Sequence, residues 1–361
     1  MTLEEIAALA GVSRSTASRV VNTQPRVSAA TRSRVLRIIS EKGYTPNVIA
    51  RSLAGHRSKT IGVLIPATMT YSIASPYYAL LMLGITTACD RRGYNLMLSP
   101  ATTHTPAGYA CINGGGLIAG LIVSSTAAGP DMLRWLVASG APVVVIGLAP
   151  DFPEMCSVSA DYVQGGRLAA EHLIRLGYRR LAVIAGPADH AGARARHDGF
   201  VAALRQADIS CPPEYDVTSE FTERGGRRGM EHLLAVQAPP EAVFCANDTV
   251  ALGAMQAAHD SGLRIPADLA VVGFDDMPMA QSMQPSLTTV RQPTEQMGLA
   301  AVDMLLDMLE TSSVPGRRTA KHVVLPTELI VRESCGSGRP MDMRNRAVLR
   351  PLIVAPGGRE G

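Results

Sequence analysis

The chain has 361 residues, of which 47% are hydrophobic and 18% charged, a composition typical of globular proteins with two or three domains. No apolar run approaches the ~20 residues of a membrane span, and Glu4 and Glu5 interrupt any signal peptide, so we expect a cytoplasmic protein without a membrane partner. Six scattered cysteines without a CxxC pair favour reduced thiols over a disulfide framework.

Positive charge is concentrated at the amino terminus. The first 60 residues hold ten Lys or Arg and three Glu, a net charge of +7, whereas the remainder carries a net of −4. A basic segment on a slightly acidic body favours a polyanionic partner for that segment. A basic surface that is merely solvated would give the same pattern.

Three short helices are predicted in this basic segment. The first covers about 3–10, because Thr2 and Glu5 have the spacing of a capping box, and it ends at Gly11. Ser13 then caps a second helix after a turn of three or four residues, the spacing of a helix-turn-helix. Ser28 caps the third helix. The expected apolar faces are Ile6, Leu9 and Ala10, then Ala17, Val20 and Val21, and finally Val35, Ile38 and Ile39.

The second helix has a polar face that suits DNA. Off its apolar face lie Arg14, Ser15, Ser18, Arg19 and Asn22. Arginine can bond a guanine edge with two hydrogen bonds, while hydroxyl and amide groups bond phosphates. An ordinary capped helix with a solvated face is the alternative.

The segments TLEEIAALAGVSRSTASRVVN and RVSAATRSRVLRIISEKGYTPNVIARSLAG resemble the DNA-binding head of LacI/GalR family transcriptional regulators. The resemblance implies a small all-α helix-turn-helix domain over 1–46 and a hinge helix with linker over 47–59. It also implies that bases are faced by Arg14, Ser15 and Arg19, and that the DNA backbone is held by Ser13, Thr16, Ser18 and Asn22.

The hinge segment from Asn47 to Ala54 is too short to form a stable helix alone, so we expect it to be helical on the operator and frayed without DNA. In the family, matching segments of two subunits pair in the minor groove, where the leucine at the position of Leu53 wedges between base pairs. The resemblance thus adds Asn47, Ala50, Leu53 and Ala54 to the expected DNA contacts. Packing of Leu53 on the body is the alternative.

From Ile61 the hydrophobic pattern changes. Short, wholly apolar runs, including IGVLI at 61, VVVIG at 143 and LAVVGF at 269, alternate with helix-length stretches such as 77–92, 164–176, 192–207, 248–260 and 295–310. This alternation predicts an α/β fold with doubly wound parallel sheets. A second round of strand and helix begins near Val158, which indicates two lobes with ligand space at the carboxyl ends of their strands.

Residues 61–334 resemble the sugar-binding core of the same family, which shares the two-lobed fold of type I periplasmic binding proteins. Markers are SPYYALLMLGI, GGRLAAEHLIRLGYRRLAVIAG, ARARHDGF and the VVGFDD strand end. The implied core is 60–334, with a first lobe of about 60–159 and 290–318 and a second of about 160–289 and 319–334. The tail over 335–361 is expected to be disordered, and its lack of heptads favours a homodimer over a coiled-coil tetramer.

A sugar effector requires carboxylate, amide and guanidinium partners and an aromatic face. By resemblance, these are Arg196, Phe221, Asn247 and Asp275 in the second lobe, with Ser75 and Tyr77 in the first. Alternatives stay open at three positions: Asp248 as a helix N-cap, Asp276 as a brace of its loop, and Arg196 as a surface salt bridge.

Two other classes of protein fit less well. GGGLIA at 114–119 matches a permissive dinucleotide pattern but does not open a helix after a strand, and no P-loop, GxSxG or metal-spaced cluster occurs. We therefore predict no enzyme, cofactor or metal. A transport binding protein would lack the basic head. The sequence favours a homodimeric repressor of carbohydrate-utilisation genes that binds pseudo-palindromic operator DNA and a sugar-like effector, with a purine or other metabolite as the alternative effector.

Overall fold

The computed structural model describes residues 1–21, 25–44, 58–66, 75–101, 117–124, 130–311 and 319–337. The chain divides into two compact units, one made mainly of residues 1–58 and the other beginning at Lys59. The predicted hinge contacts Asn47, Ala50, Leu53 and Ala54 lie outside the described residues, as do Asn22 and the tail from 338. Among the described helices, none is long and apolar enough to cross a membrane.

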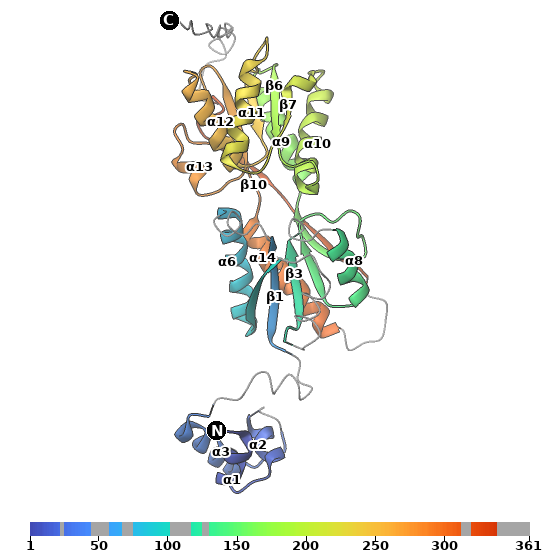
Figure 1. Cartoon of the computed structure of the whole chain (residues 1–361), viewed down its shortest axis with the longest axis vertical. Helices are drawn as coiled ribbons and strands as arrows, with labels where there is room; N and C mark the ends of the chain where they lie inside the picture. The colour runs from blue at the N-terminus through green and yellow to red at the C-terminus, as the bar shows by residue number, and fades with distance from the viewer. Residues whose placement is uncertain are drawn as a thin grey trace, which may run out of the picture. The chain divides into compact units, whose positions relative to one another are not determined.

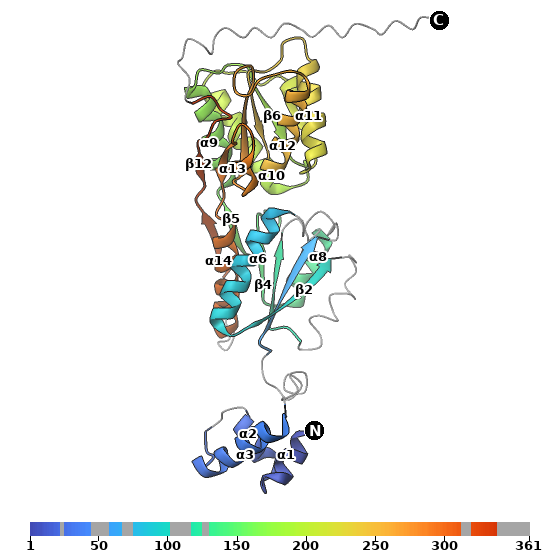
Figure 2. The same cartoon turned by 90° about the vertical axis from the view of Figure 1, so that its left-hand side faces the viewer.

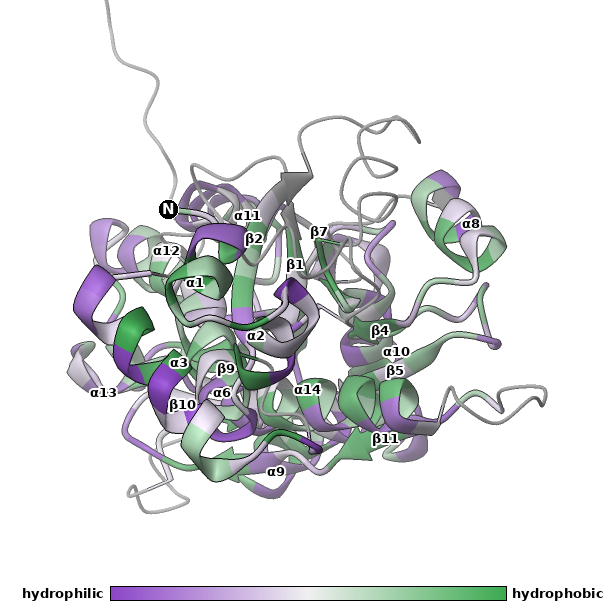
Figure 3. Cartoon of the chain, turned by 90° about the horizontal axis from the view of Figure 1, so that it is seen from below, coloured by the Kyte–Doolittle hydropathy of each residue, from purple (hydrophilic) through white to green (hydrophobic). Residues whose placement is uncertain are grey.

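The amino-terminal unit contains three helices, α1 (Leu3–Leu9), α2 (Arg14–Val21) and α3 (Ala29–Lys42). Thr2 and Glu5 form the predicted capping box at the start of α1. Ser28 caps α3, and Gly43 ends it in the left-handed conformation at φ 61°. Figure 3 shows hydrophobic and hydrophilic residues alternating around α3, as expected of a helix with one inward face. The three predicted helices are therefore confirmed.

Two residues of the predicted head core lie outside it, the exposed Leu9 and the half-buried Val21. The described core consists of Ile6, Ala10, Val20, Val35 and Ile38, with Ile39 packed against it. Leu9 is 54% exposed, because the buried face of α1 runs through Ile6, Ala7 and Ala10 and leaves Leu9 to one side. A seven-residue helix offers room for a narrow apolar stripe, and its rotation is set by packing rather than by sequence spacing.

The first lobe is built on a parallel sheet of order β11-β5-β4-β3-β1-β2. Its strands are β1 (Thr60–Pro66), β2 (Asn95–Ala101), β3 (Gly120–Ser124), β4 (Val143–Ile146), β5 (Cys156–Ala160) and β11 (His322–Leu325). Helices α6 (Pro76–Arg92) and α14 (Thr294–Thr311) cover one face, and α8 (Pro130–Ser139) covers the other (Figures 1 and 2).

The second lobe has a sheet of order β12-β10-β9-β8-β6-β7, parallel except that β12 runs antiparallel to β10. The strands are β6 (Leu181–Ala185), β7 (Asp216–Thr218), β8 (Ala242–Cys245), β9 (Ala270–Asp275), β10 (Thr288–Arg291) and β12 (Glu328–Ile330). One face packs against α9 (Tyr162–Arg175) and α10 (Ala191–Gln206), the other against α11 (Glu223–Ala235) and α12 (Asp248–Asp260). The short helices η1 (Pro213–Tyr215) and α13 (Met279–Ser282) complete the lobe.

The expected division of the chain between lobes needs two corrections. Residues 319–334 were assigned to the second lobe, but β11 pairs with β5 in the first sheet. The chain also returns from the second lobe to the first after residue 290, the expected position, since β10 pairs with β9 as far as Arg291. Strands of three or four residues carry too little hydrophobic pattern to indicate which sheet edge they join. The chain thus passes between the lobes near residues 161, 293 and 326.

Close helix crossings hold the helical layers together, and each depends on glycine. A Cβ on Gly166 of α9 would lie 1.9 Å from the carbonyl oxygen of Arg196 on α10. A Cβ on Gly84 or on Gly226 would likewise meet a carbonyl oxygen at 2.0 Å, in the α6–α14 and α11–α12 crossings. The backbones approach too closely for any side chain, so the placement of α10 relative to its sheet depends on Gly166.

Candidate DNA-binding face and effector pocket

The polar residues predicted to contact DNA lie on the outward face of α2. Ala17 and Val20 point into the head core, which leaves the other side of the helix to solvent. Exposed or half-buried on that side are Ser13, Arg14, Ser15, Thr16, Ser18 and Arg19. This is the arrangement in which the second helix of a helix-turn-helix presents its first residues to base edges.

Hydrogen bonds organise the start of α2. The Ser13 Oγ atom accepts from the Thr16 backbone N–H at 3.1 Å and lies 2.8 Å from the Ser15 hydroxyl. The Nε–H group of Arg14 donates to Glu4 Oε1 on α1. A hydrogen bond from its own backbone N–H, together with Arg14, lowers the pKa of Glu4. Glu4 is therefore ionised beside Arg14 at neutral pH.

A cavity of about 610 Å³ in the second unit is lined by residues of both lobes. It lies at the carboxyl ends of the strands: Ser124 ends β3, Gly147 follows β4, Tyr162 follows β5, Phe221 follows β7, Asn247 follows β8 and Asp275 ends β9. This cavity, the effector pocket, is lined by every residue predicted for the effector, namely Ser75, Tyr77, Arg196, Phe221, Asn247 and Asp275. That they bind an effector stays a prediction.

Arg196 is buried in the effector pocket, with 6% of its surface exposed, so the alternative of a surface salt bridge is wrong. Its Nη1 donates to the carbonyl oxygen of Ala246 at 2.6 Å, and its Nη2 lies 3.4 Å from Asp275 Oδ1. The guanidinium carbon sits 3.9 Å from the centre of the Phe274 ring, within cation–π range. These contacts fix the plane of the guanidinium group toward the pocket.

Asp275 is held by its backbone and by two partners. It ends β9 with a φ of 103°, and its Oδ1 accepts from Gln292 Nε2 at 2.6 Å. Burial raises the pKa of Asp275 to about 6, although Arg196 and the Gln292 hydrogen bond oppose that shift. Within the described residues, Arg196 Nε and Gln292 Oε1 are buried without a hydrogen-bond partner. Buried polar atoms of this kind are normally satisfied by water or ligand.

Asn247, which lines the pocket, also has the capping role that the sequence allowed Asp248. Asn247 is the N-cap of α12, where its Oδ1 accepts from the Val250 N–H at 2.8 Å, leaving the amide nitrogen for the pocket. Asp248 is fully buried and accepts from the Met277 N–H and the Thr289 hydroxyl, each at 2.6 Å. The alternative that Asp248 is the N-cap is therefore wrong. The helix α12 already begins at Asp248, so the capping position belongs to Asn247.

The brace predicted for Asp276 is confirmed. Its carboxylate contacts Arg291 Nε at 2.7 Å and Arg332 Nη2 at 2.6 Å, and its side chain is 4% exposed. Arg291 belongs to β10 and Arg332 follows β12, so one carboxylate ties the turn after β9 to the adjacent strand β10 and to the segment after β12.

Among the residues of the pocket wall that the sequence reasoning missed are Tyr162, His190 and Gln292. His190 caps α10 by accepting from the Ala193 N–H at Nδ1, 2.9 Å away, and meets Phe221 edge to face with ring centres 5.1 Å apart. Burial lowers the pKa of His190 to about 4. The imidazole is thus neutral with its proton on Nε2, and its position just after the LAVIAG strand was the signal that could have identified it.

The first-lobe side of the pocket carries two tyrosines at the start of α6. Tyr77 and Tyr78 pack edge to face with ring centres 5.2 Å apart, and both residues line the effector pocket. The Tyr78 hydroxyl lies 3.4 Å from Ser124 Oγ. Burial raises the pKa of Tyr77 well above its usual value, which keeps the phenol neutral.

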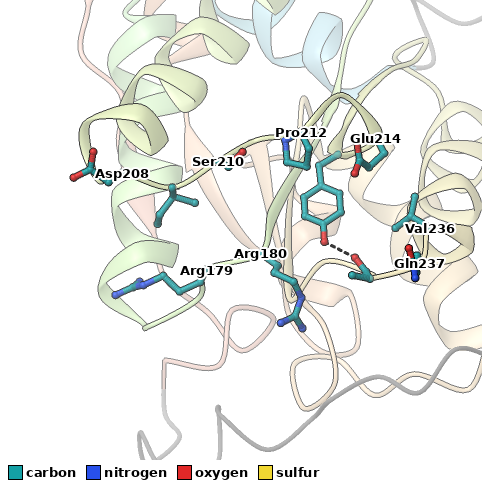
Figure 4. Close-up of a pocket in the computed structure, with 11 residues that line it drawn as sticks. Arg179, Arg180, Asp208, Ser210, Pro212, Glu214, Val236 and Gln237 are labelled. Carbon is teal, nitrogen blue, oxygen red and sulfur yellow. Dashed lines mark hydrogen bonds between the residues drawn. The ribbon is translucent and has the colours of Figure 1, made fainter.

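A second hollow of about 430 Å³ lies at the opposite, amino-terminal edge of the second sheet (Figure 4). Arg179 and Arg180 precede β6 there, and Tyr215 donates a hydrogen bond to the carbonyl of Ala238. Both arginines already have partners: Arg180 contacts Glu241 at 3.2 Å, and Arg179 donates to the Tyr178 carbonyl at 3.0 Å. Ligands of open α/β sheets bind at carboxyl ends, so this hollow is the weaker candidate.

A helix-turn-helix unit with an exposed polar reading face, joined to a two-lobed unit with a ligand-sized pocket, defines a DNA-binding regulator. Comparisons with known proteins agree. Residues 2–47 match the family model for bacterial regulatory proteins, lacI family, and residues 170–335 match the periplasmic binding protein-like domain.

Known relatives resemble the whole chain. The HTH-type transcriptional regulator CelR of Thermobifida fusca is 37% identical over 92% of this chain and 98% of its own length. The ribose operon repressor of Escherichia coli (strain K12) is 34% identical over 88% of this chain and 96% of its own. A solved lac repressor dimer bound to operator and the anti-inducer ONPF has a TM-score of 0.81 at 31% identity, covering 93% of this chain and 99% of that one. The chain belongs to the lacI family and is a DNA-binding transcriptional regulator.

Proposed function

We propose that this regulator is a homodimeric repressor of carbohydrate-utilisation genes whose operator binding is controlled by an uncharged sugar in the effector pocket. The observation that carries the proposal is the convergence of a guanidinium, an amide and a carboxylate, from Arg196, Asn247 and Asp275, on one cavity with the Phe221 ring. Planar polar groups bond paired hydroxyls, and an aromatic face packs on the C–H side of a sugar.

The charges around the pocket support a neutral effector. Its described lining contains Arg196 as the one cation, against Asp189, Glu220 and Asp275. Arg196 already contacts Asp275 and the Ala246 carbonyl. A phosphate or carboxylate on the ligand would therefore meet net negative charge without a free cation to offset it. Among similar solved structures, a CelR structure is described as a cellobiose complex.

A purine or other flat metabolite is the second candidate. The edge-to-face pair of Phe221 and His190 could place a nucleobase against the Phe221 ring, and a relative named PurR, from Pectobacterium carotovorum, is 34% identical to this chain. The His190 imidazole, neutral with a proton on Nε2, would donate to a ring nitrogen as readily as to a hydroxyl.

A thermal-shift screen of the full chain separates these candidates, since a bound ligand raises the melting temperature by mass action. The screen contains neutral monosaccharides and disaccharides, their phosphates, and nucleobases. We expect a neutral sugar to raise the melting temperature of the wild type but not of the Asp275→Asn variant. A shift with nucleobases alone, or with phosphorylated sugars alone, would contradict the sugar proposal.

We further propose that Arg14, Ser15 and Arg19 read bases while Ser13, Thr16, Ser18 and Asn22 hold the backbone. Two-fold symmetry of a dimer then demands matched half-sites, so the operator is pseudo-palindromic. Effector and operator are coupled by linkage: a sugar that closes the lobes changes how two subunits present their heads, and each ligand alters the affinity of the other by the same factor. Equal sugar affinities with and without operator DNA would rule the coupling out.

We also propose a hinge helix and linker over 47–59, with Leu53 as the residue that enters the minor groove. A wedge of this kind unstacks a base step and kinks the duplex. The Leu53→Ala variant is expected to keep its sugar affinity while its operator affinity falls at least about tenfold and the DNA bend is reduced. Gel mobility of circularly permuted operator fragments measures the bend, and an unchanged bend would contradict the wedge.

A further inference from the structure

The Glu4 carboxylate lies beside the reading face of α2, where a phosphate-binding surface would be expected to avoid negative charge. It comes from α1, ten residues before Arg14, and accepts a hydrogen bond from the Arg14 Nε–H group. Both side chains are largely exposed, at 71% for Arg14 and 57% for Glu4. The contact therefore does not serve to bury either residue.

The contact with Glu4 uses only one edge of the Arg14 guanidinium group. Glu4 engages the Nε edge, and the described hydrogen bonds of Arg14 leave both terminal amino groups free. Two N–H donors at the end of an arginine are what the O6 and N7 atoms of guanine accept. An exposed arginine otherwise samples many rotamers, and ordering it on DNA costs conformational entropy.

We propose that Glu4 is a specificity-determining positioning residue, which holds the Arg14 side chain so that its terminal amino groups select guanine in each half-site. The inference rests on the proposed base-reading role of Arg14 and goes beyond it. Glu4 touches no base itself. Its negative charge weakens the attraction of the head to any DNA phosphate. Glu4 therefore lowers the general affinity for DNA while it raises the preference for guanine at one base pair.

The head offers a matched control. Glu41 on α3 pairs with Arg37 at 3.7 Å, and the exposures of that pair, 59% and 71%, equal those of Glu4 and Arg14 within a few per cent. Replacing either glutamate by glutamine removes one negative charge from the same unit. A purely electrostatic effect on DNA binding would therefore appear in both variants.

The experiment selects duplexes from a pool of randomised palindromic sites with four full-length proteins: wild type, Glu4→Gln, Glu41→Gln and Arg14→Ala. Arg14→Ala identifies the base pair that Arg14 reads, because the guanine preference disappears there. We expect Glu4→Gln to lower the guanine preference at that same base pair by about threefold or more, against the five- to hundredfold preference that a bidentate arginine can give. Binding to non-operator DNA should rise modestly in both glutamine variants.

The possible outcomes distinguish a failure of the positioning role of Glu4 from a failure of the base-reading role of Arg14. If Arg14→Ala changes no base preference, the reading role of Arg14 is wrong and the role of Glu4 falls with it. If Arg14→Ala removes a guanine preference that Glu4→Gln leaves intact, Glu4 acts as a repelling charge and the inference alone is overturned. Loss of the preference in Glu41→Gln as well would also overturn it, since the effect would not depend on contact with Arg14.

Discussion

The Asp275 carboxyl group changes charge close to neutral pH, and its burial is the cause. Because its pKa is raised to about 6, the folded protein binds this proton more tightly than the unfolded chain does. The contribution of Asp275 to the free energy of unfolding therefore decreases as pH rises from about 4 to 6 and is constant above that range. Sugar hydroxyls that donate to the carboxylate favour the ionised form, so ligand affinity has the opposite dependence.

We expect the sugar affinity to be constant above pH 7 and to fall about tenfold at pH 5, one unit below the pKa of Asp275. Isothermal titration of the full chain between pH 5 and 8 measures this. The His190 pKa of about 4 lies below the window, and Arg228 lowers the pKa of Glu220. The Asp275→Asn variant should bind weakly with no pH dependence. A flat profile in the wild type would contradict the assignment.

The Asp276 carboxylate should contribute more to stability than its exposed counterparts. Removing it in Asp276→Ala leaves Arg332, whose side chain is 12% exposed, without its ion-pair partner. We expect a loss of about 3 kcal/mol in the free energy of unfolding, measured by urea denaturation followed by circular dichroism. The control Asp303→Ala removes a 57% exposed carboxylate 3.4 Å from Arg92 and should cost less than about 1 kcal/mol. Equal losses would show that the Asp276 network is unimportant.

At the scale of elements, the close crossing of α9 and α10 determines where α10 places Arg196 in the effector pocket. The Gly166→Ala Cβ atom would meet the Arg196 carbonyl oxygen at 1.9 Å, so the two helices must separate. We expect the variant to lose about 2 to 3 kcal/mol of stability and to bind sugar more weakly, because Arg196 moves with α10. Urea denaturation and isothermal titration measure the two effects.

Gly192, on α10, provides the comparison. A Cβ there would first meet the His190 ring at 3.0 Å, a side chain that can shift slightly. Alanine also favours a helix over glycine by about 1 kcal/mol, so Gly192→Ala should leave stability close to that of the wild type. If Gly166→Ala were equally stable, the close crossing would not control the position of α10.

At the scale of the whole molecule, the proposed dimer should involve the first lobe. Among the described residues of that lobe, Leu83 on α6 is 50% exposed and Leu98 on β2 is 43% exposed. Exposed large apolar side chains on neighbouring elements mark association surfaces. We expect Leu83→Glu to raise the dimer dissociation constant at least about tenfold and to weaken operator binding, with sugar binding retained.

Sedimentation velocity at several concentrations measures this change. Val331→Glu, in the second lobe, removes a similarly exposed side chain, 47% exposed in the wild type, and should leave association unchanged. A Leu83→Glu protein that remains as dimeric as the wild type would place the subunit contact elsewhere.

Much of this molecule was predictable because the relevant interactions are local. The capping box of Thr2 and Glu5, the caps at Ser13 and Ser28, and the apolar runs of the strands all act within one or two turns of chain. The sequence by itself therefore determined the helix-turn-helix and the alternation of strand and helix in the core, while the six residues expected around the effector came from the family resemblance.

The tertiary structure decided what depends on partners distant in sequence. Long-range packing decides which sheet β11 joins and which face of α1 is buried. It also decides that Asn247 rather than Asp248 caps α12. The same holds for Tyr162, His190 and Gln292, which enter the effector pocket because parallel strand pairing brings their strand ends to one edge. The contact of Glu4 with Arg14 likewise exists because α1 packs against α2. Hydrophobic periodicity records that a side chain is buried, but not against which neighbour.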